Sequence, residues 1–184
     1  MEPKIQNIVA TANLGIPLDV KVIASLNKNA KYNAKYNAKM NNAIIKIENP
    51  KCTALVFKTG KIVCIGTKNE SDALRACTEF ENMIFKMGFK TQLTDFKIQN
   101  ITASCDLQFL IDLNKLHVIL IQSGSSSSYE PELFPGLRYR LSYPKVTFLI
   151  FRSGKIVLTE AKIQKHIYSA FQFLYPTIKE GRKT

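Results

Sequence analysis

Six residues that could bind a polar partner recur along the chain at a spacing of 93 or 94 positions. They are two amides, two hydroxyls and two phenylalanines: Asn7, Thr11, Phe57, Asn100, Ser104 and Phe151. Amides and hydroxyls donate hydrogen bonds, and aromatic rings stack on flat groups or wedge between them. The set is therefore suited to recognition by contact rather than to bond-making chemistry.

These residues lie inside a long internal repeat. KIQNIVAT at residues 4–11 matches KIQNITAS at 97–104, and the longer word ALVFKTGKIVCIGTK matches FLIFRSGKIVLTEAK in the same way. A period this long exceeds that of solenoid repeats and indicates duplication of one subdomain. We therefore predict two halves, residues 1–92 and 93–184, which face each other across a pseudo-twofold axis.

Each half is predicted to contain a strand, a helix, several strands and a second helix. Apolar residues at helical spacing predict a helix over Ser71–Met87, and the same pattern runs from Ile163 to Leu174. Glycine-containing segments at 58–61 and 152–155 separate apolar runs and predict tight hairpin connections.

The strands that precede these hairpins are apolar on both faces. ALVF at 54–57 and FLIF at 148–151 lack the alternation of apolar and polar residues that a sheet with one wetted face normally shows. One interpretation is that other parts of the chain cover both faces. The alternative is that the few predicted helices cover one face and leave the other as an apolar surface for a partner.

The chain is strongly basic, with a formal net charge of +12 and an isoelectric point near 9.6. The excess of Lys and Arg over Asp and Glu is present in both halves and is not confined to a tail. Such a charge favours nucleic acid, an acidic membrane surface or an acidic protein as partner. The simpler interpretation is a soluble basic protein whose charges are only solvated.

The sequence offers no support for a catalytic or metal site. The four cysteines are Cys52, Cys64, Cys77 and Cys105. They lack C-x-x-C spacing and are expected to be buried in a reducing compartment. His117 and His166 look isolated, with no triad-like partner. We expect no enzyme, no cofactor and no metal, in an intracellular protein without a signal peptide or a membrane-spanning segment.

Among polyanions, the minor groove of DNA fits an apolar sheet with basic edges best. A membrane would call for a basic amphipathic anchor, and RNA-binding sheets carry glycine–aromatic patterns, neither of which occurs here. The minor groove has, at A·T pairs, only hydrogen-bond acceptors on its floor. The amides of Asn7 and Asn100, beside the small side chains of Val9, Val63 and Val157, would match that floor.

From Ile5 to Lys183 the sequence resembles the TATA-box-binding protein family. The words that carry the resemblance are QNIVAT, NAKYN, NPKCTALVF, TDFKIQNI, SCD, YEPELFPGL and SGKIVLT. The resemblance implies an α+β saddle of two tandem repeats, with a curved antiparallel sheet of about ten strands and about four helices on its convex face. The resemblance also implies a kink of about 80° in bound DNA, which is a known property of the family.

The family opens the groove with two pairs of phenylalanines. One pair falls on Phe134 and Phe151, and the first half has Phe57. The fourth position falls on Met40, because KYNA is duplicated in KYNAKYNAKMNN where the family has a single block; a shift of the gap by one residue would place Asn41 there. Methionine is a flexible apolar wedge without a flat face, so we expect a softer kink at that end.

Three further departures from the family change the expected surface. Thr102 stands where the family has a small apolar residue, and Ile65 replaces a threonine that would supply a hydroxyl. The segment LHVILIQSGSSSS is longer than the corresponding loop of the family, and its serines are expected to form mobile surface.

The repeat and the resemblance together predict the following DNA contacts: Asn7, Val9, Thr11, Met40, Lys46, Leu55, Phe57, Lys61, Val63, Asn100, Thr102, Ser104, Phe134, Arg140, Leu149, Phe151, Lys155, Val157 and Thr159. Of these, Lys46, Lys61, Arg140 and Lys155 are expected to face phosphates, which supplies affinity and register without sequence information. A merely solvated position is the alternative for each lysine.

Glu130, Glu132 and Leu133 match the part of the family that binds transcription factor IIB. The resemblance also implies promoter DNA, transcription factor IIA, TBP-associated factors, assembly factors of RNA polymerases I, II and III, a nuclear location, and a homodimer when free of DNA. The leading hypothesis is a general transcription initiation factor that binds TATA or A·T-rich promoter DNA in the minor groove, kinks it and nucleates the preinitiation complex. The alternative is a divergent assembly platform with weak or relaxed DNA specificity.

Overall fold

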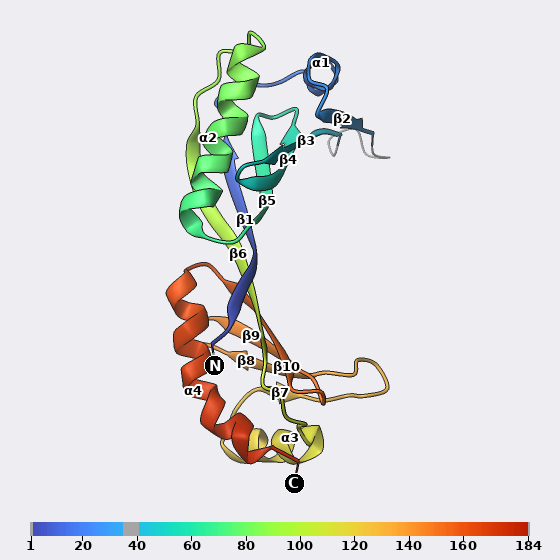
Figure 1. The fold of residues 1–184 in the computed structure, drawn as a ribbon, viewed down its shortest axis with the longest axis vertical. Coiled ribbons are helices and arrows are strands. Elements are labelled where there is room, and N and C mark those ends of the chain that lie inside the picture. The colour runs from blue at the N-terminus through green and yellow to red at the C-terminus, as the bar shows by residue number, and fades with distance from the viewer. Residues whose placement is uncertain (1, 35–40, 184) are drawn as a thin grey trace. The chain divides into compact units, whose positions relative to one another are not determined.

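The computed structural model describes residues 2–34 and 41–183, so Met40 lies outside the described residues. Within them the chain forms ten strands and four helices (Figure 1). The strands are β1 (Lys4–Asn13), β2 (Ala30–Asn33), β3 (Asn42–Glu48), β4 (Lys51–Phe57), β5 (Lys61–Thr67), β6 (Thr94–Asp106), β7 (Ser127–Ser128), β8 (Leu137–Leu141), β9 (Val146–Ile150) and β10 (Lys155–Ala161). The helices are α1 (Val20–Leu26), α2 (Glu70–Lys86), α3 (Leu113–Gln122) and α4 (Gln164–Glu180).

The strand order repeats the duplication seen in the sequence. The order is β2-β3-β4-β5-β1-β6-β10-β9-β8-β7, so the second five strands match the first five in reverse. Within each repeat the described strands pair antiparallel. The predicted α+β class with about ten strands and four helices is confirmed for the described part of the chain.

By their contacts, the residues form two compact units. The first-half unit is Asn7–Gln99, and the second-half unit is Asn100–Thr184 together with Met1–Gln6. These boundaries fall inside β1 and β6, because each of these long strands contributes to both units. The boundary between the two sequence repeats, which we placed after residue 92, therefore stays a prediction.

Within each unit, a side-chain hydrogen bond joins the long strands β1 and β6. In the second-half unit, Gln6 Nε2 of β1 donates to Ser104 Oγ of β6 across 2.9 Å. In the first-half unit, Gln99 Nε2 of β6 donates to Thr11 Oγ1 of β1 across the same distance, 2.9 Å. The matching pairs show that the duplication extends to local contacts.

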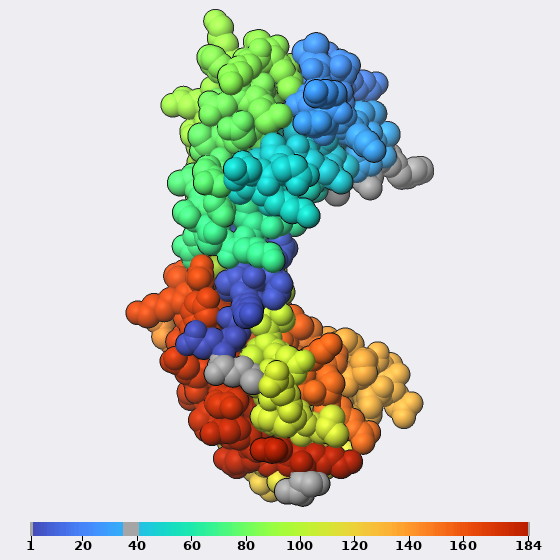
Figure 2. Space-filling model, viewed as in Figure 1, coloured from blue at the N-terminus to red at the C-terminus, as the bar shows by residue number. Residues whose placement is uncertain are grey.

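The core of each unit lies between its long helix and one face of the sheet. In the first-half unit α2 packs on β4 and β5, and its Phe80 and Ile84 are fully buried. In the second-half unit α4 packs on β9 and β10 and buries Ile167 and Leu174. The shorter α1, blue in Figure 2, lies beside β3, shown in cyan, on the first-half unit.

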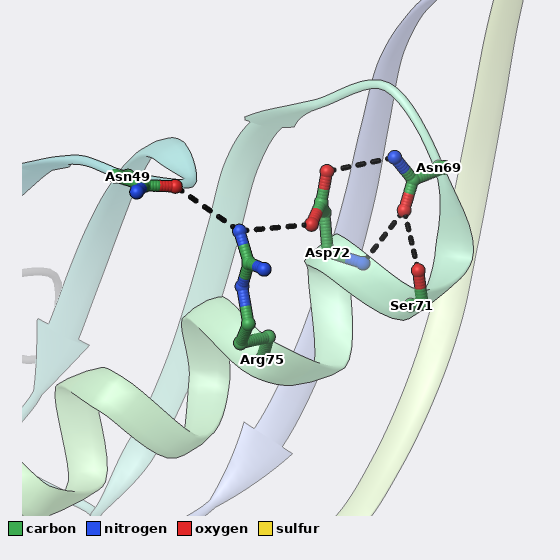
Figure 3. A network of polar contacts seen from close by, with 5 residues as sticks. All are labelled: Asn49, Asn69, Ser71, Asp72 and Arg75. Carbon is green, nitrogen blue, oxygen red and sulfur yellow. Dashed lines mark hydrogen bonds and ion pairs between the residues drawn. The ribbon is translucent and has the colours of Figure 1, made fainter.

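The start of α2 is fixed by a polar network (Figure 3). Asn69 is the N-cap: its Oδ1 accepts hydrogen bonds from Asp72 N at 2.7 Å and from Ser71 Oγ at 2.8 Å. Its Nδ2 donates to Asp72 Oδ2 at 2.7 Å. Arg75 pairs with Asp72 at 3.2 Å and donates to Asn49 Oδ1 at 3.2 Å, which ties the helix to the β3–β4 turn. Satisfying free N–H groups in this way stabilises a helix start.

Two sequence predictions are corrected. Ile163 was expected on the apolar stripe of the last helix, but it is the N-cap of α4 and is exposed, since the stripe begins at Ile167. The segment LHVILIQSGSSSS was expected to be a lengthened loop whose serines form mobile surface. Instead its apolar part belongs to α3, whose Leu116 and Leu120 are buried, and Ser127–Ser128 pairs with β8. Helical periodicity in LHVILIQ explains the difference.

The hairpin predictions are confirmed. Gly60 N donates to Phe57 O at 3.0 Å and Gly154 N donates to Phe151 O at 2.9 Å, closing the two turns. Both glycines have positive φ, 89° and 87°, a conformation that other residues adopt at a cost. Among the described residues no helix is both long and apolar enough to cross a bilayer.

Candidate nucleic-acid interface

The doubly apolar strands have one deeply buried face and one partly uncovered face. In β4, Ala54 and Val56 are fully buried beneath α2, whereas Leu55 and Phe57 are half-buried on the opposite side. The same alternation occurs in β10, and in β9 Leu149 is half-buried whereas Thr147 on the same side is buried. We call the side with the half-buried residues the open face of each unit. The finding favours the interpretation that the helices cover one face and leave the other for a partner.

The predicted contact residues stand in matching rows on the two open faces. Backbone pairing places four neighbouring strands in register, so their side chains lie next to one another on the same face. The row in the first-half unit is Ile44, Leu55, Val63 and Thr11. The row in the second-half unit is Arg138, Leu149, Val157 and Ser104. The structure thus brings together six of the residues predicted from the sequence.

A second pair of rows lies beside the first. In the first-half unit it comprises Lys46, Thr53, Ile65 and Val9. In the second-half unit Arg140 pairs with Thr147 and Thr147 with Thr159, and Thr159 Oγ1 lies 3.4 Å from Thr102 Oγ1. The sequence prediction missed four open-face positions: Ile44, Thr53, Arg138 and Thr147. The period of two along each strand, applied with the repeat, would have found them.

The two asparagines present hydrogen-bond donors and not acceptors. Asn100 Oδ1 accepts from Glu160 N at 2.8 Å and from Thr159 Oγ1 at 3.3 Å. Asn7 Oδ1 is buried and accepts no hydrogen bond within the described part of the chain, although the residue as a whole is only half-buried. Asn100 Nδ2 donates to Thr102 Oγ1 across a long 3.5 Å, which leaves its second N–H. With both oxygens occupied or buried, the remaining side-chain N–H groups are what a ligand could meet.

The second-half unit also carries the predicted phenylalanine pair. Phe134 and Phe151 are half-buried, with ring centroids 5.8 Å apart in an edge-to-face arrangement. Arg138 lies over the Phe134 ring, 5.9 Å from its centroid. Gly136 makes this approach possible, because a Cβ there would lie 2.7 Å from Phe134 Cε1 and 3.0 Å from Phe151 Cε1. Phe57 is half-buried at the end of β4, and its predicted partner Met40 is not among the described residues.

The four basic residues predicted to face phosphates are exposed: Lys46, Lys61, Arg140 and Lys155. Lys46, Lys61 and Lys155 share their strand faces with half-buried residues of the open face. Arg140 shares the face of β8 with the exposed Arg138. In the second-half unit, Lys155 and Lys4 also line a depression of about 500 Å³, together with Ser104, Val157 and the carboxylates Glu2 and Asp106. Cations beside an apolar face are suited to a polyanion.

Glu130, Glu132 and Leu133 lie in an exposed loop between β7 and β8. The loop is closed by hydrogen bonds from Leu133 N and Phe134 N to Glu130 O, each of 3.0 Å. Leu133 is 81% exposed, which is unusual for leucine, so the loop presents an apolar side chain as well as two carboxylates.

Three of the cysteines, Cys52, Cys64 and Cys77, form a buried sulfur cluster in the first-half unit, and Cys105 lies in the second-half unit. All four are free and buried, as predicted, and Cys77 Sγ lies 3.2 Å from Cys64 Sγ. The contacts with Cys52 and Cys77, together with burial, raise the pKa of the Cys64 thiol. The contact with Cys64 lowers the pKa of Cys52, and burial raises the pKa of Cys105. The described residues include no group of three or more His, Cys, Asp or Glu that could hold a metal ion.

His117 is not isolated, which corrects the sequence prediction. Its Nδ1 lies 2.9 Å from Ser127 Oγ, since the pairing of β7 with β8 brings the serine beside α3. Tyr129 packs edge-on against the same imidazole with a centroid separation of 6.4 Å. Within the described residues no carboxylate is hydrogen-bonded to this imidazole, as a charge-stabilised triad would require.

The fold and the open faces define a class: two-repeat α+β proteins whose helices cover one sheet face and whose other face suits a polyanion. The family model described as "Transcription factor TFIID (or TATA-binding protein, TBP)" matches residues 2–87 and 95–181. The chain belongs to this family.

Relatives of known name agree over nearly the full chain. The TATA-box-binding protein of Schizosaccharomyces pombe is 51% identical over 98% of this chain and 76% of its own length. That of Saccharomyces cerevisiae is 50% identical over 98% of this chain and 73% of its own length. The solved structure of Methanococcus jannaschii TBP superposes with a TM-score of 0.78 at 32% identity, covering 98% of this chain and 99% of that one.

Proposed function

We propose that this protein is a general transcription initiation factor that binds TATA or A·T-rich promoter DNA in the minor groove, kinks it with apolar side chains and seats the next assembly factors. The observation that carries the proposal is the state of the two asparagines. Both offer donors, and the floor of an A·T minor groove offers only acceptors. Family membership and relatives named for the TATA box support the same conclusion.

The proposed mechanism is an exchange of free energies. Unstacking a base step costs about a few kcal/mol, and the wedges that would do this are Phe57, Phe134 and Phe151. The cost is offset when the sugar edges cover the half-buried residues of the open faces and when phosphates release counterions to the basic side chains. Sequence is read by Asn7 and Asn100 and by the deformability of the DNA.

The partner surface is proposed separately from the DNA surface. The loop of Glu130, Glu132 and Leu133 places two carboxylates where a phosphate backbone would repel them, which supports a protein as its occupant. From the family resemblance we propose transcription factor IIB here, with transcription factor IIA, TBP-associated factors and the polymerase assembly factors on other surfaces, in the nucleus. We expect the Leu133→Ala variant to lose binding to transcription factor IIB and to keep its affinity for DNA.

A combined binding and bending experiment tests the function. A duplex containing TATAAAAG carries a fluorophore at each end, and its affinity and end-to-end distance are compared with those of a G·C-substituted duplex across a salt series. A strong A·T preference with a large loss of end-to-end distance is expected. Weak, sequence-blind binding to straight DNA would contradict the proposal and support the assembly platform instead.

A further inference from the structure

Glu160 occupies a backbone conformation that the repeat otherwise gives to glycine. Residue 160 of the second half corresponds to Gly66 of the first half, and the register of β10 shifts between Leu158 and Ala161, as that of β1 shifts opposite β5. Both residues have positive φ, 119° for Gly66 and 69° for Glu160. Glycine adopts such values freely, whereas a residue with a Cβ does so at a cost. A strained glutamate at this bulge indicates that its side chain has a role.

The contacts of Glu160 hold its carboxylate on the open face of the second-half unit. Thr147, which pairs with Thr159 across the open face, donates its hydroxyl to Glu160 Oε2 at 3.0 Å. The backbone N–H of Glu160 donates to Asn100 Oδ1 at 2.8 Å, so the main chain that carries the carboxylate is held by the Asn100 side chain. Within the described residues no Lys, Arg or His forms an ion pair with Glu160.

Among its described residues the first-half unit has no counterpart of this network. Its corresponding open-face positions are Val9, Thr53, Ile65 and Gly66, where the second-half unit has Thr102, Thr147, Thr159 and Glu160. Three of the four pairs therefore differ in polarity, and the second-half unit alone adds a hydrogen-bond acceptor with a full charge. The two open faces therefore present different groups to a partner.

The chemistry of the minor groove identifies what a carboxylate at this place would bind. The floor at an A·T pair presents only acceptors, so a carboxylate against it would lose water and gain no donor. A G·C pair adds one donor, the 2-amino group of guanine. A hydrogen bond to a charged acceptor is stronger than one between neutral groups.

We propose that Glu160 makes the second-half unit specific for a G·C pair at one position of its half-site, by accepting a hydrogen bond from the guanine 2-amino group. Thr147 is the positioning residue that holds the carboxylate. The inference rests on the proposed minor-groove function and deepens it, because it assigns one base preference to one of the two repeats.

The test uses inosine, which lacks only the 2-amino group of guanine. Each position of the A·T-rich site is replaced in turn by a G·C or an I·C pair, and binding is measured for the full-length wild type, Glu160→Gly and Thr147→Val. For each protein, the Kd for the I·C duplex is divided by the Kd for the G·C duplex. The ratio for the wild type is then divided by the ratio for the variant, so that intrinsic differences in duplex stiffness cancel. Glu160→Gly is expected to fold, since Gly66 occupies the equivalent position.

The inference predicts that this quotient reaches roughly tenfold at one position and stays near one elsewhere. Thr147→Val should reduce the same preference at the same position, and Glu160→Gly should bind the all-A·T duplex more tightly than wild type does. A quotient near one at every position, with A·T-rich binding and bending intact, would overturn the role of Glu160 and leave the proposed function standing. Absence of A·T preference and of bending in the wild type would reject both.

Discussion

Replacing Phe151 with alanine should weaken DNA binding and reduce the bend at one end of the site. Phe151 is half-buried and packs edge-to-face on Phe134 at 5.8 Å, so it acts with a partner. Stacking of a base on an aromatic side chain contributes about 1–3 kcal/mol, and an edge-to-face pair about 0.5–1.5 kcal/mol beyond its buried area. A loss of about 2–3 kcal/mol, or roughly 30- to 150-fold in Kd, is expected.

The assay is titration of the doubly labelled TATAAAAG duplex, read both as affinity and as end-to-end distance. Phe173→Ala is the matched control, because it is the same substitution at a residue of α4 that is 65% exposed and not on the sheet. Thermal unfolding of both variants shows whether the fold is kept. Removal of a half-buried side chain should cost less than the roughly 3–5 kcal/mol of a buried phenylalanine.

Two results would refute the reasoning. An unchanged affinity and bend in Phe151→Ala would show that the ring does not enter the DNA. An equal loss in Phe173→Ala would show that the effect arises from stability rather than from the open face. The double substitution with Phe134→Ala adds a further check, since residues that act as a pair should give less than the sum of their separate losses.

Three further predictions concern charge, packing and capping. Lys61→Gln and Lys155→Gln should each lower the slope of log Kobs against log salt by about 1 on any sequence, and a loss confined to A·T-rich DNA would contradict a phosphate contact. Gly136→Ala should push the ring of Phe134 away, since its Cβ would lie 2.7 Å from that ring, and lower affinity with little change in helix content by circular dichroism; wild-type affinity would contradict this. Asn69→Ala should lower the free energy of unfolding by about 1 kcal/mol in urea titrations without changing DNA affinity, and an unchanged stability would show that the cap is dispensable.

Much of the fold follows from local pattern and from duplication. The helical stripe at 71–87 predicts α2 within one residue at each end, and the glycines of the two hairpins mark the turns, because each depends on the conformational preference of neighbouring residues. The repeat of KIQNI predicts that Asn7 and Asn100 occupy equivalent places. The prediction that Ile163 lies on the apolar stripe of the last helix was wrong. Ile163 is an apolar residue at helical spacing, but its exposure is decided by where α4 begins.

The tertiary structure decided which apolar residues are core and which are surface. The sequence of β4 allows either face to be buried, since Ala54 and Val56 are no more apolar than Leu55 and Phe57. Only the packing of α2 on one side resolves this, because burial depends on what another segment covers.

The sequence by itself determined the duplication, the family and the positions of the residues that we propose as donors and wedges, since these are properties of residue type and spacing. Only the tertiary structure placed Glu160 beside Asn100 and Thr147, which lie 60 and 13 positions away along the chain. A hydrogen-bond network of this kind depends on strand register and on a bulge with positive φ, and no periodicity in the sequence encodes either.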